Sequence, residues 1–310
     1  MELRDTAGLY TTLVTPRGPR FLYFGVPLGA LVLARAGMPP APAALAPLDL
    51  PGRRRLRRIL GPRTLLLGSP RLTSSAVQAA LVSVRPEASL VFYWPRRIPE
   101  ALLRLAPAWG VHPSLLPAWR GPDPTYWAIR SGARETGVSL HALEGAYDTG
   151  AVAARATVPI HDADDAWTLA RRLDRPGLRL LLYAAARLGA GLPLVADPQD
   201  PRLATAAPFP TDADLALDWR LPAAELVRHV RAAAPEPGAH GLVADRAFLV
   251  RRARVARARL PAGLRPAEAI ATAEGWHVRC GEGALTLEEV SDEEGRPLEV
   301  ATLFEAPGGG

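Results

Sequence analysis

The sequence predicts an α/β protein, in which a mostly parallel, Rossmann-like sheet is followed by a small β-barrel of the OB type. Two observations support this fold class. Through the first two thirds of the 310 residues, short apolar segments alternate with segments of helical spacing, an order typical of parallel sheets. From Leu217 onward one amphipathic helix precedes several short alternating segments, which is typical of a small barrel.

The N-terminal elements follow from local spacing. Residues 1–20 carry little periodic pattern, and residues 38–51 contain five prolines, which predicts a loop. Between and after these segments we expect a strand, a turn near Gly25 and a helix over 21–36, a strand over 64–68, a helix over 74–84, a strand over 89–93 and a short helix over 99–105.

The C-terminal third is set off by a proline-rich stretch. A helix is predicted over Trp167–Leu188, with an interruption near Pro176–Gly177. The division that we expect is a first domain over 1–195, a linker over 196–212 and a barrel-like domain over 213–310. In that last domain the predicted elements are a helix over 222–233 and strands over 247–250, 276–279 and 284–290.

Composition excludes several classes of protein. Hydrophobic content is 48% and charged content is 22%, which are ordinary values for a globular protein. The single cysteine, Cys280, cannot form an intrachain disulfide. No segment reads as a membrane span or a secretory signal, so we expect a cytoplasmic protein without a membrane partner. The spacing of the six histidines fits no metal site, and we expect no metal.

The net charge of +6 comes from arginine without any lysine. Arginine favours bidentate contact with phosphate, so RNA or a nucleotide is a reasonable partner. The same composition arises in a GC-rich genome without selection for binding, and both interpretations stay open.

One histidine and one aspartate stand out in the middle of the chain. His112 begins the rigid string HPSLLPAWRG, and Asp148 lies 36 residues later in the glycine-bounded string YDTG. A strand–helix–strand crossover would bring the two to the same end of a sheet. The carboxylate could then orient the imidazole for proton transfer. A structural role for the pair is the alternative.

Three strings occur in a characteristic order: HPSLLPAWRG at 112–121, ETGVSLHAL at 135–143 and YDTG at 147–150. This arrangement resembles the folate-dependent formyltransferases, a family that includes methionyl-tRNA formyltransferases and amino-sugar formyltransferases. The resemblance implies a formyltransferase of one-carbon metabolism, with a Rossmann-like N-terminal domain. Such an enzyme passes a formyl group from 10-formyltetrahydrofolate to a primary amine.

The resemblance also implies roles for individual residues. His112 would be the catalytic histidine and Asp148 its partner. The expected folate-binding residues are Tyr93, Trp94, Ser114, Leu115, Leu116, Pro117, Glu144, Tyr147, Thr149 and Gly150.

Gly110 departs from the family pattern, which has an asparagine two residues before the histidine. In the family that amide donates a hydrogen bond to the developing oxyanion, and the loss of such a donor costs ~3–4 kcal/mol, or roughly 10²–10³ in rate. The chain is therefore predicted to be an enzyme with impaired turnover, or a non-catalytic homologue that binds folate or RNA. If the rest of the site is intact, Gly110→Asn should raise activity by about 10².

Two arginine clusters bear on the acceptor. The first resembles a basic loop that contacts the acceptor stem in methionyl-tRNA formyltransferases, and the alternative is a solvated helix start. Residues 246–259 hold six further arginines, which suit an RNA backbone or a charged sheet edge. We expect initiator methionyl-tRNA as the acceptor, in protein biosynthesis, with a nucleotide-linked amino sugar as the alternative. The RNA-contact candidates in the first cluster are Arg53, Arg54, Arg55, Arg57 and Arg58.

Overall fold

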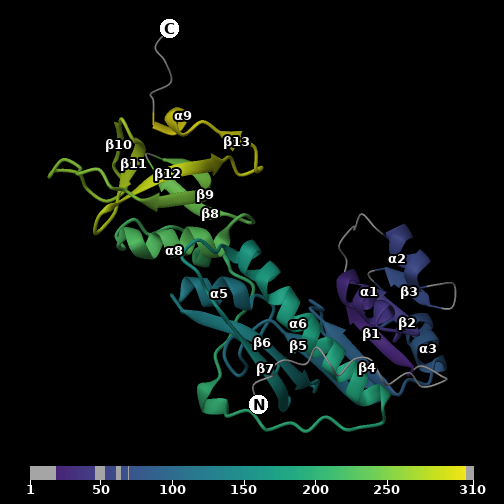
Figure 1. Ribbon diagram of the computed structural model, residues 1–310. Coiled ribbons are helices and arrows are strands. Elements are labelled where there is room, and N and C mark those ends of the chain that lie inside the picture. Colours follow the sequence, from purple (N-terminus) through teal and green to yellow (C-terminus); the bar gives the residue numbers. More distant parts are fainter. Residues whose placement is uncertain (1–18, 46–52, 61–63, 69, 244, 305–310) are drawn as a thin grey trace. The chain divides into compact units, whose positions relative to one another are not determined.

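The computed structural model describes residues 19–45, 53–60, 64–68, 70–243 and 245–304 (Figure 1). The chain forms two compact units. The first comprises the residues up to Pro124 together with 135–159 and 172–207. The second comprises 125–134, 160–171 and the residues from Pro208 onward. The domain boundary at 196–212 stays a prediction.

The first unit contains a seven-stranded sheet of order β3-β2-β1-β4-β5-β6-β7. Its first five strands are parallel, whereas β6 and β7 are antiparallel to their neighbours. A mostly parallel sheet of this kind confirms the predicted fold class. The strands are β1 (Phe21–Gly25), β2 (Pro42–Leu45), β3 (Leu65–Gly68), β4 (Ala88–Phe92), β5 (Ala108–His112), β6 (Glu135–Ala142) and β7 (Val152–Pro159).

Strands β1 and β4 form the centre of this sheet. Every residue of both strands is buried, as expected for parallel strands that are covered on both faces. The strand order reverses between β1 and β4, and ligands of open α/β sheets bind beyond the carboxyl ends of the strands at such a point. At that edge Gly25 has φ +150°, and a Cβ there would lie 2.1 Å from the carbonyl oxygen of Phe92, so only glycine fits.

Helices accompany the strands as predicted, with two corrections. The predicted loop over 38–51 contains β2, which Pro42 can begin because the first position of a strand tolerates proline. The helix predicted to break at Pro176 is continuous. Its buried residues Leu180 and Leu181 lie beyond the proline, and we attribute its continuity to tertiary packing that outweighs the ~3 kcal/mol cost of proline. The helices are α1 (Pro27–Arg35), α2 (Arg53–Leu60), α3 (Ser75–Ser83), α4 (Glu100–Leu103), α5 (Pro124–Arg130) and α6 (Ala166–Gly189).

The C-terminal part of the second unit is an antiparallel sheet of six strands (Figure 1). This all-strand sheet is the element that the sequence predicted as a small barrel. Helix α8 (Ala223–Ala233) contacts β9 and β12 through its buried face, which includes Leu226 and Val230. The other elements from residue 201 onward are the 3₁₀ turn Pro201–Leu203, α7 (Asp212–Leu215), β8 (Ala239–Val243), β9 (Arg246–Val255), β10 (Ala269–Thr272), β11 (Gly275–Arg279), β12 (Ala284–Ser291), β13 (Pro297–Leu298) and α9 (Val300–Phe304).

Among the residues that the structure describes, no helix combines the length and the apolar character that a membrane crossing requires.

Candidate active site

The end of β5 positions the candidate catalytic histidine. Phe92 of β4 is paired with Val111 of β5 in parallel register, so Tyr93 and His112 follow at the same carboxyl edge of the sheet. His112 is the last residue of β5 and is 7% exposed. Its Nε2 lies 2.9 Å from the carbonyl oxygen of Trp119. Because a carbonyl only accepts, this nitrogen carries a proton and donates.

Asp148 contacts His112, although by a route different from the predicted crossover. Strand β6 runs antiparallel to β5, so their carboxyl ends do not share an edge. The loop between β6 and β7 instead carries Asp148 to the histidine, with 3.5 Å between Asp148 Oδ2 and His112 Nδ1. The Asp148 side chain is 14% exposed, so the contact is largely shielded from water.

Backbone and side-chain hydrogen bonds hold Asp148 in place. Its φ of 54° lies in the left-handed region, which aspartate tolerates better than most residues. The N–H of Gly121 donates to Asp148 Oδ2 at 2.9 Å. The side-chain amide of Gln199 donates to the carbonyl oxygens of Asp148 at 2.8 Å and Gly150 at 2.7 Å, and Arg120 donates to the Gln199 Oε1 at 2.8 Å. Sequence reasoning missed Gln199, because no motif surrounds it.

A second histidine, which sequence reasoning also missed as a site residue, contacts the same carboxylate. His141 Nε2 lies 3.5 Å from Asp148 Oδ1, and its side chain is 2% exposed. The pKa of His141 is lowered to about 4, chiefly by burial; Asp148 opposes this shift and His112 adds to it. The imidazole is therefore neutral near neutral pH. Its alternation with Ser139 along β6 was the only signal in the sequence.

The HPSLLP segment is fixed by buried hydroxyls. The Ser139 hydroxyl accepts from the N–H of Leu116 at 3.0 Å and donates to the carbonyl oxygen of Ser114 at 2.7 Å. The Ser114 hydroxyl donates to the carbonyl oxygen of Ala118 at 2.6 Å. Ser114 is fully buried and Leu116 is 1% exposed, so their side chains hold this loop. Folate contact by Ser114, Leu115, Leu116 and Pro117 stays a prediction.

Tyr93 and Trp94 follow β4 at the carboxyl edge. Tyr93 has φ 55°, stacks on Phe92 and donates its hydroxyl to the carbonyl oxygen of Leu173 at 3.2 Å. Trp94 packs edge-on against Phe24, and the guanidinium of Arg96 lies 4.6 Å from its ring centroid. Within the described residues, the Nε1 of Trp94 is buried without a hydrogen-bond partner.

The remaining folate candidates lie around the loop that carries Asp148. Glu144 is exposed and Tyr147 is 55% exposed, so the structure does not bring either side chain into the buried cluster. Thr149 donates to the carbonyl oxygen of Ala146 at 3.4 Å. A Cβ at Gly150 would lie 2.0 Å from the carbonyl oxygen of Ala142, which explains the glycine. Their roles toward folate stay predictions.

Gly110 lies opposite His141 in the pairing of β5 and β6. A Cβ at position 110 would lie 2.9 Å from Leu143 Cδ2 and 3.3 Å from His141 Nε2. Both distances are shorter than ordinary contacts, so a side chain at this position would require its neighbours to move. The effect of Gly110→Asn on activity stays a prediction.

The two arginine clusters differ in what the structure describes. Helix α2 exposes Arg57 and Arg58, whereas the side chains of Arg53, Arg54 and Arg55 lie outside the described residues. Strand β9 pairs with both β8 and β12, so its arginines do not form the charged sheet edge that was the alternative to RNA binding. Three of these arginines form ion pairs with acidic side chains. The pairs are Arg251 with Glu236, Arg252 with Glu288 and Glu289, and Arg254 with Glu274 and Glu288.

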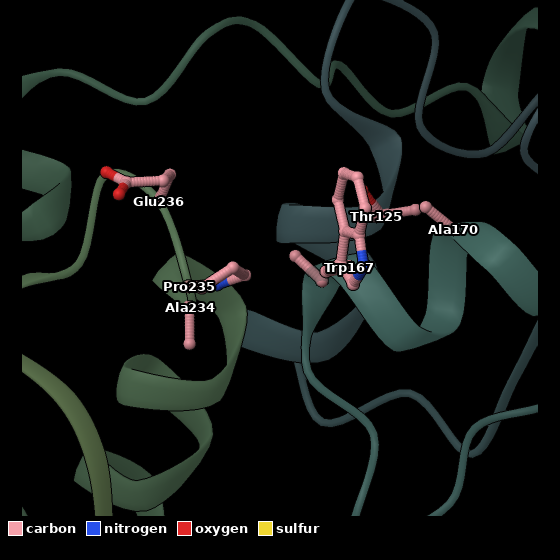
Figure 2. Close-up of a pocket in the computed structure, with 7 residues that line it drawn as sticks. Thr125, Trp167, Ala170, Ala234, Pro235 and Glu236 are labelled. Carbon is pink, nitrogen blue, oxygen red and sulfur yellow. The ribbon is translucent and has the colours of Figure 1, made fainter. Parts of the chain in front are cut away.

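The second unit holds a pocket of about 360 Å³ beside Trp167. Figure 2 shows Trp167, Thr125 and Ala170 on one side of it. The indole is 60% exposed, so it offers an aromatic face. The residues opposite are Ala234, Pro235 and Glu236, and Ala166 completes the lining.

Within the described residues, no group of three or more His, Cys, Asp or Glu side chains is placed to hold a metal ion.

Comparison with known proteins gives two family matches. Residues 36–184 match the model described as formyl transferase, and residues 211–307 match the formyl transferase C-terminal domain. A methionyl-tRNA formyltransferase from Pseudomonas paraeruginosa is 35% identical over 76% of this chain and 75% of its own. One from Anaeromyxobacter dehalogenans is 35% identical over 76% of each chain.

Solved structures show the same fold. HypX from Aquifex aeolicus in complex with tetrahydrofolic acid matches with a TM-score of 0.67 and 20% identity, over 93% of this chain and 47% of that one. The chain thus spans about half the length of HypX. An N-formyltransferase from Helicobacter canadensis, in complex with folinic acid and dTDP-3-aminofucose, matches with a TM-score of 0.65 and 11% identity over 90% of this chain and 100% of that one.

Proposed function

The chain belongs to the formyl transferase family, and from this premise we propose that it transfers the formyl group of 10-formyltetrahydrofolate to the amine of methionyl-tRNA. The observation that carries the proposal is the contact between His112 and Asp148, at 3.5 Å and largely shielded from water. This contact supplies the oriented imidazole that amine acylation needs.

In the proposed reaction the amine nitrogen attacks the formyl carbon, a new C–N bond forms, and the bond between that carbon and N10 of the folate breaks. The amine loses one proton and the departing N10 gains one, so the two sides balance. His112 carries this proton between them. Its Nε2 already donates to Trp119, so the proton resides on Nδ1, where Asp148 stabilises it.

The wall formed by Tyr93 and Trp94 suits the formyl donor. The buried Nε1 of Trp94, and the Nε and Nη2 of Arg96, have no hydrogen-bond partner within the described part of the chain. Buried donors of this kind are normally satisfied, so a bound molecule with acceptor atoms fits here. The aromatic surfaces of Tyr93 and Trp94 suit the pterin ring, and the carboxylates or carbonyl of a folate suit the three donors.

Methionyl-tRNA is the proposed acceptor because two features favour RNA. Relatives that are 35% identical to this chain over the aligned residues are named methionyl-tRNA formyltransferases. Arg57 and Arg58 are exposed on α2, where they can neutralise phosphates without reading sequence. Replacing both by glutamine should raise the KM for methionyl-tRNA and flatten its salt dependence, while the KM for the donor stays unchanged.

The direct test uses the purified full chain with 10-formyltetrahydrofolate and methionyl initiator tRNA, and mass spectrometry of the released methionine. Formylmethionine is the expected product. A second arm offers a nucleotide-linked amino sugar, the acceptor favoured if this chain follows the Helicobacter canadensis relative. If only the amino sugar is formylated, the proposed acceptor is wrong, whereas the proposed formyl transfer still holds.

A non-catalytic folate- or RNA-binding protein is the second candidate, and Gly110 favours it because the amide expected two residues before His112 is missing. This candidate predicts that folate binds, by calorimetry, while neither acceptor gains a formyl group.

A further inference from the structure

The proton positions on His112 and His141 follow from their backbone contacts. His112 Nε2 and His141 Nδ1 each lie 2.9 Å from a carbonyl oxygen, that of Trp119 and that of Ala142 respectively. A carbonyl oxygen only accepts, so both nitrogens carry hydrogen. In the neutral imidazoles the other nitrogens, His112 Nδ1 and His141 Nε2, therefore hold lone pairs. Each faces one oxygen of Asp148 at 3.5 Å.

This arrangement is unfavourable without an additional proton. A carboxylate only accepts, and so does the bare nitrogen of a neutral imidazole, so two lone pairs point at a shielded anion. One added proton converts one of these contacts into a charge-assisted hydrogen bond. Burial keeps His141 neutral near neutral pH, since it lowers the pKa of that imidazole to about 4. The charged and titratable groups facing His141 are His112 at the end of β5, Asp148 in the loop after β6, and Arg120.

The glycine at position 110 leaves room for the imidazole of His141. The two residues are direct cross-strand partners, and such partners project to the same side of a sheet. A Cβ at 110 would already lie 3.3 Å from His141 Nε2. The ring of His141 therefore lies in the space that a side chain at position 110 would need.

We propose that His141 is a positioning residue for formyl transfer, which acts by presenting a lone pair to Asp148 Oδ1 and so favours a proton between His112 Nδ1 and Asp148 Oδ2. The kinetic test of this inference rests on the proposed function, whereas the positions of the protons rest on the geometry of the cluster alone. His141 does not have to contact either substrate for this role.

The kinetic test is the pH profile of kcat for His141→Phe, which removes both ring nitrogens and keeps a planar ring. Without the opposing lone pair the deprotonated cluster is more stable, so the midpoint of the profile should move to lower pH by about 0.5 to 1. The sign holds whether activity needs the protonated or the deprotonated form. The KM for the donor should not change. His240→Phe, in the other unit, is the matched control and should leave the midpoint unchanged.

His141→Gln keeps the test decisive if the phenylalanine variant does not fold. Its side-chain amide can donate to Asp148, so the midpoint should again fall. An unchanged midpoint in every folded variant would overturn the proposal, because a merely structural role alters stability without shifting the profile.

A readout independent of turnover separates this inference from the proposed function. Nitrogen-15 NMR of the histidine rings in the full chain should show His141 protonated at Nδ1 at pH 7, and the ring nitrogen shifts of His112 should change in His141→Gln. A proton on Nε2 of His141 would refute the inference even if formyl transfer occurs. A chain that transfers no formyl group, yet shows these NMR shifts, would refute only the proposed function.

Discussion

The cluster of His112, Asp148 and His141 in the first unit differs from the Trp167 pocket of the second in how polar atoms are satisfied. Each side chain of the cluster is at most 14% exposed. Backbone groups fix one nitrogen of each imidazole and one oxygen of the carboxylate. The pocket holds a single acidic side chain, Glu236, which is 74% exposed and already paired with Arg251.

The difference assigns separate kinetic effects to the two regions. Buried groups with fixed geometry can stabilise a transition state, because they need no reorganisation when charge develops. An exposed indole beside alanine and proline can add contact area for a ligand but cannot move a proton. Substitutions in the cluster should therefore lower kcat, and substitutions in the pocket should raise the KM for the acceptor.

The largest expected effect comes from His112→Ala. Removing a positioned acid–base group should lower kcat by roughly 10²–10⁴, with little change in the KM for the donor. Steady-state kinetics with the proposed acceptor measures it, and His240→Ala serves as the control. A loss of less than about tenfold would remove His112 from the proton path.

Asp148→Asn should have the next largest effect. Asparagine keeps the shape and accepts the left-handed φ of 54°, but its neutral amide no longer stabilises a proton on His112, so kcat should fall by about 10². Asp245→Asn is a matched control, because Asp245 is exposed and has φ 61°. If the two variants have equal kcat, Asp148 is structural only.

The sequence predicts much of this cluster, because motif residues lie at the ends of strong elements. His112 ends a strand and Asp148 lies in a glycine-bounded loop, so both were identified from their strings alone. Gln199 and His141 were not identified from the sequence. Gln199 acts through its amide on loop carbonyls 49 and 51 residues away, and His141 depends on a strand register that periodicity does not give.

The fold was predictable to a similar degree. Continuous apolar runs predicted the buried strands β1 and β4. Strands that are covered on both faces have apolar residues throughout and do not alternate between apolar and polar residues. Proline was the main source of error. Pro42 begins a strand and Pro176 lies within a helix, and in both places tertiary packing outweighs the local preference that predicted a break.

Gly110→Asn should have a smaller effect than the substitutions of His112 and Asp148, and it tests how tightly the cluster is packed. The new side chain must displace Leu143 and His141, so we expect a loss of about 1–3 kcal/mol in stability and no gain in kcat. Thermal unfolding and steady-state kinetics measure the two effects. Adding Leu143→Ala should recover part of the stability, because the shorter approach, 2.9 Å, is to that side chain. A gain of about 10² in kcat from Gly110→Asn alone would show that the site adapts freely.

The smallest expected effect belongs to the pocket. If the exposed indole of Trp167 stacks on a base of the acceptor, Trp167→Ala should raise the KM for methionyl-tRNA about 5-fold, or ~1 kcal/mol. The kcat and the KM for the donor should not change, because the indole of Trp167 does not act as an acid or a base. Phe209→Ala is the matched control, since Phe209 is 62% exposed in the same unit. Equal KM values for the two variants would leave the pocket without a part in acceptor binding. A lower kcat in Trp167→Ala would contradict the separation between a cluster that performs chemistry and a surface that only binds.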